Sequence, residues 1–427
     1  MKLLYINTYI PYPLNSGGNQ AFFMMADHVR KHHDLSVLLY VHHSQEHQNV
    51  EKLKELWPDV HFYIYEPHAA NSSTEYHGMS WFDRKYCTSL EAICHSFTRK
   101  IERRKRKYSQ DFVRANSTLF KNTADLTPDF CAYVQQVVSQ GFDAVQVEFY
   151  EYLPLIHVLP STVKKVFVHH ELRFIRNENE YQLYEHPDAT DLILLQQEKA
   201  QELAALAACD AIITLTEIDK QILGRYLPSE KIHVSPAITQ TITLKKKNFR
   251  PAMELMFIGS GSHFPNADAM IWFCKQVVPF IRKETSTFPP IHISGDWPKD
   301  LQKTISHLCP EVVFDGFIDN LPNFLNGKIS IVPIRIGSGM RMKILDAMAA
   351  AAPIITTSKG CEGLPVKNGI HCLIADEADE FAHAIVRLMH DVVLQQTLAE
   401  NAQKEDNTSL NDTELLARRL AIYDSLF

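Results

Sequence analysis

The sequence predicts an α/β protein of two domains, each built around a parallel sheet. Three observations lead to this prediction. The 427 residues exceed what one ordinary hydrophobic core organises, which favours two domains. Short β-branched apolar segments alternate with amphipathic helical segments along the chain. Ten of the fifteen glycines lie between Gly259 and Gly369, so sharp turns and close approach to a ligand are expected in the second half.

The overall composition narrows the class of protein. The chain is 45% hydrophobic and 22% charged, as expected of a globular protein, and its net charge of −7 argues against nucleic-acid binding. The eight cysteines are scattered without a C-x-x-C pair, which favours reduced thiols in a cytoplasmic protein over disulfides or a zinc site. No apolar run approaches the roughly 20 residues of a membrane span, and the short apolar start indicates a strand, not a signal peptide.

The first domain is predicted to cover residues 1–240. A strand at 2–7, a loop at 8–18, a helix at 19–31 and a strand at 35–41 form a βαβ unit. Gly17 and Gly18 lie in that loop, at the strand end where α/β sheets bind ligands. An ordinary connecting loop is the alternative, because the third glycine of a dinucleotide-binding motif is absent.

Two further strands of this domain end in polar residues. A strand at 141–148 ends at Glu148, with Glu151 just beyond it, and a strand at 164–168 leads into His169-His170-Glu171. These positions suit chemistry at a sheet edge. Neighbouring residues of an extended chain point to opposite faces, so the histidines and the glutamate do not form a metal site together. The alternative is a loop in which hydrogen bonds satisfy the histidines. Helices at 130–139, 192–208 and 217–226 and strands at 210–216 and 231–236 complete the domain.

A basic segment interrupts the first domain. Seven of the nine residues from Arg99 to Lys107 are Lys or Arg. One interpretation is a solvated helix. The other is a patch attracted to anionic lipid or to a phosphorylated acceptor, which would bring a cytoplasmic protein to the inner face of the membrane.

The second domain is predicted at 252–410, after a basic, Pro-terminated linker at 241–251 and before a C-terminal helix at 411–427 that could pack back on the first domain. It repeats a strand–glycine loop–helix unit about five times. Its first loop is predicted at 259–268, with a helix from 269 to 283.

The segment 333–364 carries the clearest chemical signal. An apolar strand ending at Pro333 is followed by Gly337-Ser338-Gly339 and then, from about Met340 to Pro353, by helical spacing. Amides at a helix N-terminus bind phosphate, and Arg341 and Lys343 add positive charge there. The alternative is that both cations are solvated and that Lys343 pairs with Asp346 at i,i+3.

The motifs of the second half resemble those of GT-B glycosyltransferases, in particular glycosyltransferase family 4. They are G-S-G-S-H-F-P-N-A-D from Gly259, I-S-G-D-W-P from Ile293, F-D-G-F-I-D-N-L from Phe314, P-I-R-I-G-S-G-M-R-M-K-I-L-D-A-M-A from Pro333, G-C-E-G-L from Gly360 and V-K-N-G-I-H-C-L-I-A-D from Val366. The first half matches through its Gly-Gly loop and its His-His-Glu strand end. The resemblance implies two Rossmann-like domains facing a central cleft.

The resemblance also implies roles for individual residues. The N-terminal domain would bind the acceptor, near Gly17, Gly18, Glu148 and Glu151, and His170 would point at the transferred sugar. The C-terminal domain would bind a nucleotide-sugar, with Arg341 and Lys343 at its diphosphate, Asp346 at the ribose, and Phe317 and Ile318 against the base. The remaining donor-binding positions it implies are Gly259, Asn266, Gly295, Gly337, Ser338, Gly339, Met340, Glu362, Gly363 and Leu364. No metal or other cofactor is expected, since amides and cations would neutralise the leaving diphosphate.

Two features of the sequence depart from the family pattern. Relatives often carry acids eight residues apart, where this chain has Ser338 and Asp346, and many place Arg and Lys in the loop that here contains Asn266. Retention of anomeric configuration is implied, through attack on the same face as the leaving phosphate or through Glu148, Glu151 or Glu171 as nucleophile or base.

The function predicted from the sequence is therefore transfer of a sugar from a UDP- or GDP-sugar to a glycan or lipid-linked acceptor, in cell-surface polysaccharide or glycoconjugate synthesis. Two alternatives stand beside it: a nucleotide-sugar 2-epimerase on the same fold, and an inactive GT-B partner subunit.

Overall fold

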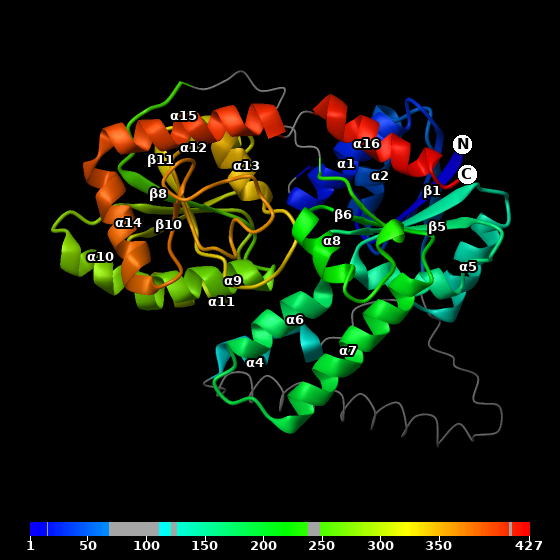
Figure 1. Cartoon of the computed structure of the whole chain (residues 1–427), viewed down its shortest axis with the longest axis horizontal. Coiled ribbons are helices and arrows are strands. Elements are labelled where there is room, and N and C mark those ends of the chain that lie inside the picture. The colour runs from blue at the N-terminus through cyan, green and yellow to red at the C-terminus, as the bar shows by residue number, and fades with distance from the viewer. Residues whose placement is uncertain (15, 68–110, 121–125, 238–247, 410–411) are drawn as a thin grey trace.

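The computed structural model describes residues 1–14, 16–67, 111–120, 126–237, 248–409 and 412–427. It contains two sheets, of seven and six strands, in two domains that lie side by side (Figure 1). All registered strand pairs are parallel, which confirms the predicted α/β class. The basic segment from Arg99 to Lys107 and positions 241–247 of the predicted linker lie outside the described residues.

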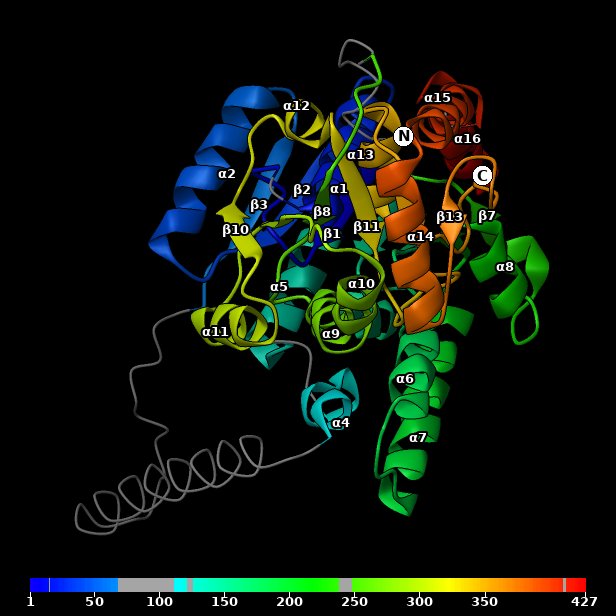
Figure 2. The same cartoon turned by 90° about the vertical axis from the view of Figure 1, so that its left-hand side faces the viewer.

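The N-terminal sheet has the order β3-β2-β1-β4-β5-β6-β7. Its strands are β1 (Lys2–Asn7), β2 (Asp34–Tyr40), β3 (His61–Tyr65), β4 (Ala144–Glu148), β5 (Lys164–His169), β6 (Ala211–Thr214) and β7 (Ile232–Val234). The helices and 3-10 turns around it are α1 (Gly17–Val29), α2 (Ser44–Leu56), α4 (Phe112–Asn116), η1 (Thr118–Phe120), α5 (Pro128–Val138), η2 (Tyr150–His157), α6 (Arg173–Gln182), α7 (Ala189–Ala207), α8 (Glu217–Leu223) and η3 (Ser229–Lys231). Figure 2 shows α6 and α7 extending together away from the body of the domain.

The C-terminal sheet has the order β10-β9-β8-β11-β12-β13. Its strands are β8 (Glu254–Ile258), β9 (Ile291–Ser294), β10 (Val312–Gly316), β11 (Lys328–Val332), β12 (Ile354–Thr356) and β13 (Leu373–Ile374). Its helical segments are α9 (Phe264–Trp272), the π-helical turn η5 (Phe273–Val277), α10 (Val278–Glu284), α11 (Lys299–Leu308), α12 (Leu321–Leu325), α13 (Met342–Ala349), α14 (Ala378–His390) and α15 (Val392–Ser409).

Three of the helix boundaries that differ from the sequence prediction have a clear physical cause. Helix α1 begins at Gly17 and not at Asn19, because Ser16 caps it by accepting a hydrogen bond from the Asn19 amide at 3.1 Å. Helix α9 begins at Phe264 and not at 269, with Pro265 in its first turn, where proline is favoured. Helix α13 ends at Ala349, ahead of Pro353, since Ala351 adopts a left-handed conformation at φ 52°.

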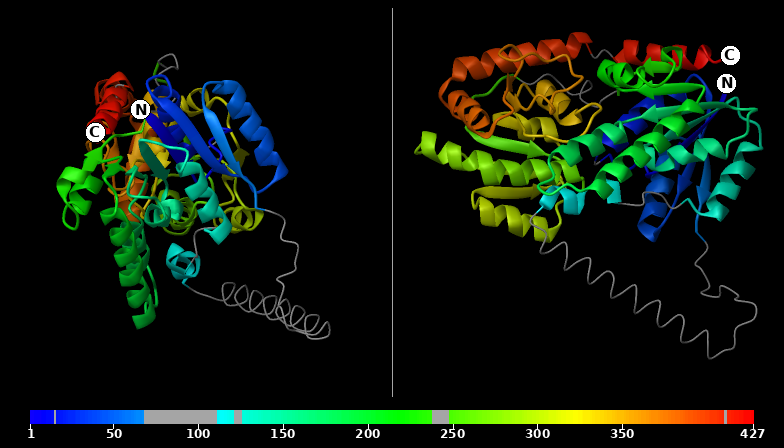
Figure 3. Two further views of the ribbon diagram at one scale, coloured as in Figure 1. Left: turned by 90° about the vertical axis from the view of Figure 1, so that its right-hand side faces the viewer. Right: turned by 60° about the horizontal axis from the view of Figure 1, so that its bottom comes forward.

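Helix α16 (Asp412–Asp424) returns to the N-terminal domain and lies beside α1 (Figures 1 and 3). The buried Tyr423 hydroxyl donates to Gln146 Oε1 at 2.6 Å and lies 2.5 Å from the Tyr5 hydroxyl. Arg419 donates to Ser235 Oγ at 2.9 Å. The end of the chain is thereby tied to strands β1 and β4 of the first sheet.

Each sheet reverses its strand order at one point. These points lie between β1 and β4 in the first sheet and between β8 and β11 in the second. In open parallel sheets, the loops at the carboxyl ends of the strands beside such a point enclose the ligand crevice. Gly17 and Gly18 begin helix α1, which follows β1, and do not lie in the predicted loop; the Gly337–Gly339 loop follows β11. Both segments flank a reversal point.

Candidate active site

The glycine loop between β11 and α13 is shaped by its glycines. Gly337 and Gly339 have φ values of 115° and 76°, which favour glycine over other residues. A Cβ at Gly339 would collide with the carbonyl oxygen of His170 in the other domain. Ile344 and Leu345 are completely buried and fix α13 behind the loop. The loop is therefore held between the C-terminal sheet and the end of β5.

Two hydrogen bonds join this loop to the N-terminal domain. The Leu172 amide, at the N-terminus of α6, donates to Ser338 Oγ at 2.6 Å. The Gly337 amide donates to Asn179 Oδ1 at 3.2 Å. Ser338 is 1% exposed, so this hydroxyl sits inside the domain contact. A phosphate bound at the Gly337 amide would have to replace the Asn179 oxygen.

Arg341 and Lys343 behave differently at the start of α13. The Arg341 guanidinium folds back, and its Nη1 donates to the carbonyl oxygens of Ser338 and Gly339. Its Nη2 is buried and has no hydrogen-bond partner among the described residues. Lys343 instead donates to Asn266 Oδ1 at 2.6 Å and lies over the Phe257 ring.

The pKa of Lys343 is lowered to about 7. Burial is the main cause, since it disfavours the charged form, and the neighbouring Arg341 guanidinium adds to it while Asp346 opposes it. A strongly shifted pKa beside a buried, unsatisfied guanidinium nitrogen is typical of a site that takes an anion.

Several predicted donor-binding residues meet around Asn266. A Cβ at Gly259 would lie 2.5 Å from Asn266 Nδ2, and one at Gly295 would lie 2.7 Å from the Gly259 carbonyl oxygen. Asn266 Nδ2 donates to the Ser260 carbonyl at 2.9 Å. Asn266 thus joins Lys343 to the end of β8, and Gly295 brings the end of β9 against Gly259.

The other predicted donor residues follow strands β10, β11 and β12. Phe317, after β10, is 59% exposed, so its ring faces solvent. Glu362 pairs with Lys359 at 2.7 Å. A Cβ at Gly363 would lie 2.6 Å from Thr216 Cγ2 of the N-terminal domain, so this segment forms a second domain contact. The partly buried residues Met340, Asp346 and Ile318 and the buried Leu364 occupy the same edge of the C-terminal sheet.

On the N-terminal side, His170 lies against Glu148. Their Nε2 and Oε2 atoms are 2.6 Å apart, and the Phe149 ring stacks on the imidazole with centroids 4.0 Å apart. Gln146 Nε2 donates to the other Glu148 oxygen at 2.6 Å. Glu148 is 3% exposed, so the structure makes it the partner of His170 and not a group open to an acceptor. This buried position argues against Glu148 as a nucleophile.

The remaining acceptor-side residues also contact neighbours at this edge. Glu151 accepts from Arg173 Nη2 at 2.9 Å. A Cβ at Gly17 would lie 2.9 Å from Met342 Cγ at the start of α13. Gly18 packs against Phe149. Gly17 and Gly18, at the start of α1, therefore lie against both the start of α13 and the Phe149 ring that covers His170.

Sequence reasoning missed helix α6, which supplies the residues facing the glycine loop. Its mean hydropathy is low, so no apolar stripe predicts it. Arg173, Arg176, Asn177 and Glu180 are nevertheless buried on one face. Their i, i+3, i+4, i+7 spacing is the helical period. Charged residues at helical spacing are therefore the feature of the sequence that could have predicted α6.

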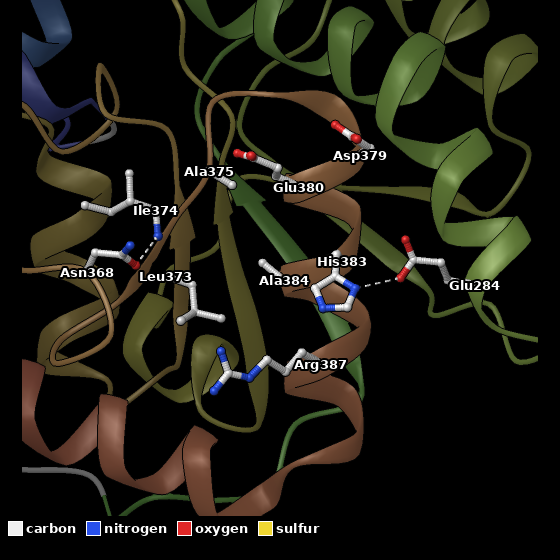
Figure 4. A pocket seen from close by; sticks show the side chains of 10 residues that line it. All are labelled: Glu284, Asn368, Leu373, Ile374, Ala375, Asp379, Glu380, His383, Ala384 and Arg387. Atoms are coloured by element: carbon white, nitrogen blue, oxygen red, sulfur yellow. Dashed lines mark hydrogen bonds and ion pairs between the residues drawn. The ribbon is translucent and has the colours of Figure 1, made fainter.

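A separate hollow lies on the outer side of the C-terminal domain (Figure 4). It has a volume of about 500 Å³ and lies between β13 and α14. Its walls are Glu284, Asn368, Leu373, Ile374, Ala375, Asp379, Glu380, His383, Ala384 and Arg387. None of the residues predicted for the site lines it, so it is distinct from the edge just described.

Within the described part of the chain, no group of three or more His, Cys, Asp or Glu side chains is placed to hold a metal ion. No helix in those same ranges is long and apolar enough to cross a membrane.

Comparison with known proteins gives a family match to the second half of the chain. Residues 252–391 match the family described as Glycosyl transferases group 1. The chain is 26% identical over 204 residues to an uncharacterized 44.6 kDa protein in the cps region of Klebsiella pneumoniae, covering 44% of this chain and 49% of that protein. It is 30% identical over 121 residues to YtcC of Bacillus subtilis (strain 168), covering 27% and 30%. The matches thus span half or less of these curated relatives.

Solved structures match over essentially the whole chain. TarM of S. aureus, in complex with Fondaparinux, alpha-GlcNAc-glycerol and UDP, has a TM-score of 0.67 at 11% identity, covering 99% of this chain and 100% of that one. HepE of Anabaena with UDP-glucose has a TM-score of 0.62 at 14% identity, covering 100% of both. WaaG, a glycosyltransferase involved in lipopolysaccharide biosynthesis, has a TM-score of 0.60 at 12% identity, covering 98% and 99%. Residues 252–391 therefore form a group 1 glycosyltransferase domain, and the chain has the GT-B fold.

Proposed function

We propose that this protein is a glycosyltransferase that moves a hexose from a nucleotide-sugar to an acceptor bound against the N-terminal domain. The carrying observation is Lys343, whose pKa is about 7 and which lies beside a glycine loop at a helix N-terminus. This lysine is poised to gain charge when an anion binds. Arg341 Nη2, buried without a partner in the described ranges, adds a second donor at the same loop.

The two domains would divide the chemistry between them. Arg341 and Lys343 stabilise the diphosphate as negative charge develops on it, without a metal. His170 lies across from the loop, fixed by Glu148 and by the stacked Phe149 ring, and would contact the transferred sugar. Asp346 would accept from the ribose hydroxyls.

Retention would follow from attack on the face that the leaving phosphate occupies. Two of the three candidate carboxylates are engaged with a cation: Glu171 pairs with Arg176, and Glu151 pairs with Arg173. The third, Glu148, is paired with His170. A carboxylate already paired in this way is a poor nucleophile, which favours the phosphate-assisted route.

The similar proteins bear on the identity of the donor and of the acceptor. TarM and HepE were solved with UDP or UDP-glucose, WaaG is involved in lipopolysaccharide biosynthesis, and the Klebsiella relative lies in a cps region. These relatives support a UDP-sugar donor and a glycan or lipid-linked acceptor in cell-surface polysaccharide synthesis. Action of a cytoplasmic protein at the inner face of the membrane is part of the proposal because of the basic segment from Arg99 to Lys107.

A thermal-shift panel of UDP-, GDP-, ADP- and TDP-sugars tests the donor assignment. A ligand at one hundred times its Kd stabilises the folded state by about 2.7 kcal/mol, so the matching base gives a clear rise in Tm. The bound donor is then incubated with and without lipid-linked or glycan acceptors in EDTA, and the products are separated. Sugar transfer only with an acceptor supports the proposal. An epimerised or hydrolysed donor without an acceptor identifies the 2-epimerase instead, and binding without any conversion identifies a partner subunit.

A further inference from the structure

A cluster of charges at the domain contact is not used by the mechanism above. It contains Glu171, just after β5, and Arg176, in the second turn of α6. Arg176 Nη1 donates to Glu171 Oε1 at 2.7 Å, and its Nε donates to Glu180 Oε1 at 3.0 Å. The Arg176 side chain is 5% exposed and that of Glu171 is 21% exposed. Both residues belong to the N-terminal domain, but the cluster also touches the C-terminal domain.

The other side of this cluster is the C-terminal domain. Arg176 Nη1 lies 3.5 Å from His263 Nε2, in the loop after β8. Glu171 Oε2 and Arg341 Nη2 lie 3.5 Å and 3.0 Å from the point where a Gly337 Cβ would be. The Glu171 carboxylate therefore faces the glycine loop on the same side as the unsatisfied guanidinium nitrogen.

The charges around Arg176 and Glu171 indicate what this pair contributes to the glycine loop. The loop from Gly259 to Asp268 contains no Arg or Lys of its own, and Lys343 of the same domain reaches it at Asn266. Arg176 adds a cation from the opposite domain, beside His263. The surrounding charges hold the pKa of Glu171 well below its usual range: burial alone would raise it, but Arg176, Arg173 and His263 outweigh that effect. The carboxylate therefore stays charged, paired with Arg176 and close to Gly337 of the glycine loop.

We infer that Arg176 is a further diphosphate-binding residue, delivered across the domain contact, and that Glu171 occupies its anion position until the donor enters. This inference rests on the proposed function. An entering diphosphate takes over the Arg176 Nη1 contact from Glu171, while Glu180 keeps the guanidinium in place through Nε. Because Arg176 and the glycine loop belong to different domains, the diphosphate site is complete only when the domains are closed.

Calorimetric titration of the full-length protein with UDP, inorganic pyrophosphate and uridine tests this inference. Arg176→Gln is expected to raise the Kd of UDP and of pyrophosphate at least tenfold. Glu171→Gln removes the competing carboxylate and is expected to lower both at least threefold. Uridine carries no phosphate, so its affinity should stay within twofold in both variants.

Matched controls lie on neighbouring surfaces. Glu178 of α6 and Lys199 of α7 form an ion pair at 2.9 Å away from the glycine loop, so Glu178→Gln and Lys199→Gln repeat the charge changes without touching the site. Both should leave UDP affinity within twofold. Since Arg176→Gln leaves two carboxylates unpaired, the double variant Glu171→Gln/Arg176→Gln, checked by thermal unfolding, is the second test. It should bind UDP at least tenfold more weakly than Glu171→Gln.

The outcomes separate this inference from the proposed function. If Arg341→Gln and Lys343→Gln weaken UDP and pyrophosphate binding but Arg176→Gln and the double variant do not, the inference is wrong and the donor site stands. Weaker binding in Glu171→Gln would also overturn it, since the carboxylate would then be supporting the site. If none of the cation variants changes pyrophosphate binding, the proposed donor site itself fails.

Discussion

Replacing Lys343 with arginine tests whether its pKa of about 7 governs nucleotide binding. A bound diphosphate favours the ammonium form, so the free protein must take up a proton whenever it binds UDP above pH 7. With that pKa, about half of the lysines are charged at pH 7 and roughly one in a hundred at pH 9. The Kd for UDP should therefore rise about 50-fold from pH 7 to 9, a loss of about 2.3 kcal/mol.

Isothermal titration at several pH values measures the Kd for UDP, and the use of two buffers with different ionisation enthalpies measures the proton uptake. About 0.9 proton should be taken up per UDP at pH 8. Phosphate has its second pKa near 6, so the diphosphate of UDP changes charge little in this window. The Lys343→Arg variant keeps its charge throughout, and its Kd should be nearly constant from pH 7 to 9. A flat profile in the wild type, or the same slope in the variant, would refute the reasoning.

The pH dependence of unfolding in the absence of nucleotide gives an independent check on the pKa of Lys343. The folded-state pKa of Lys343 is depressed, so between about pH 7 and its ordinary 10.5 the unfolded chain binds more protons. Its contribution to the free energy of unfolding must therefore rise with pH across that window. Comparing urea unfolding of wild type and Lys343→Met at pH 7 and 9 measures it: the stability advantage of the variant should shrink at the higher pH, and an advantage that grows would contradict the shift.

Three further predictions concern the packing around His170. Gly339→Ala, whose Cβ would collide with the His170 carbonyl, should lower the free energy of unfolding by about 2 kcal/mol or more in urea, whereas Gly316→Ala, strained in φ but with open space around it, should cost less. Glu148→Gln should lower kcat at least tenfold while UDP affinity, followed by calorimetry, stays within twofold; a large change in UDP affinity instead would show that Glu148 serves the donor site. Tyr423→Phe leaves Gln146 Oε1 without its donor and should cost about 1–3 kcal/mol in urea unfolding, with no cost if that oxygen finds another partner.

Ser338 lies at the position where family relatives often carry an acid. In the structure its hydroxyl accepts from the Leu172 amide at 2.6 Å, in a contact that leaves it 1% exposed. Glu202 already accepts from the next two amides of the same helix end, Arg173 and Phe174. The serine therefore belongs to the contact between the two domains.

Much of the fold could be predicted from local sequence. Alternating apolar strands and helices predict parallel sheets, in which the strand-to-helix connections gather at the carboxyl ends of the strands. The sequence therefore predicts that Gly17 and Gly337 lie at sheet edges. Helix α6 was not expected, because it buries charged residues against other charged residues and so lacks an apolar stripe.

The sequence by itself determined the two sheets, the glycine turns and the presence of cations at the start of α13, because these follow from periodicity and from the φ angles that glycine allows. The tertiary structure alone decided the partners: Leu172 and Ser338 are 166 positions apart, and Lys343 meets Asn266 across 77 positions. Such pairs depend on how the strands are ordered and how the domains close. Burial beside Asn266 and Phe257, which no local pattern encodes, is the main cause of the lowered pKa of Lys343.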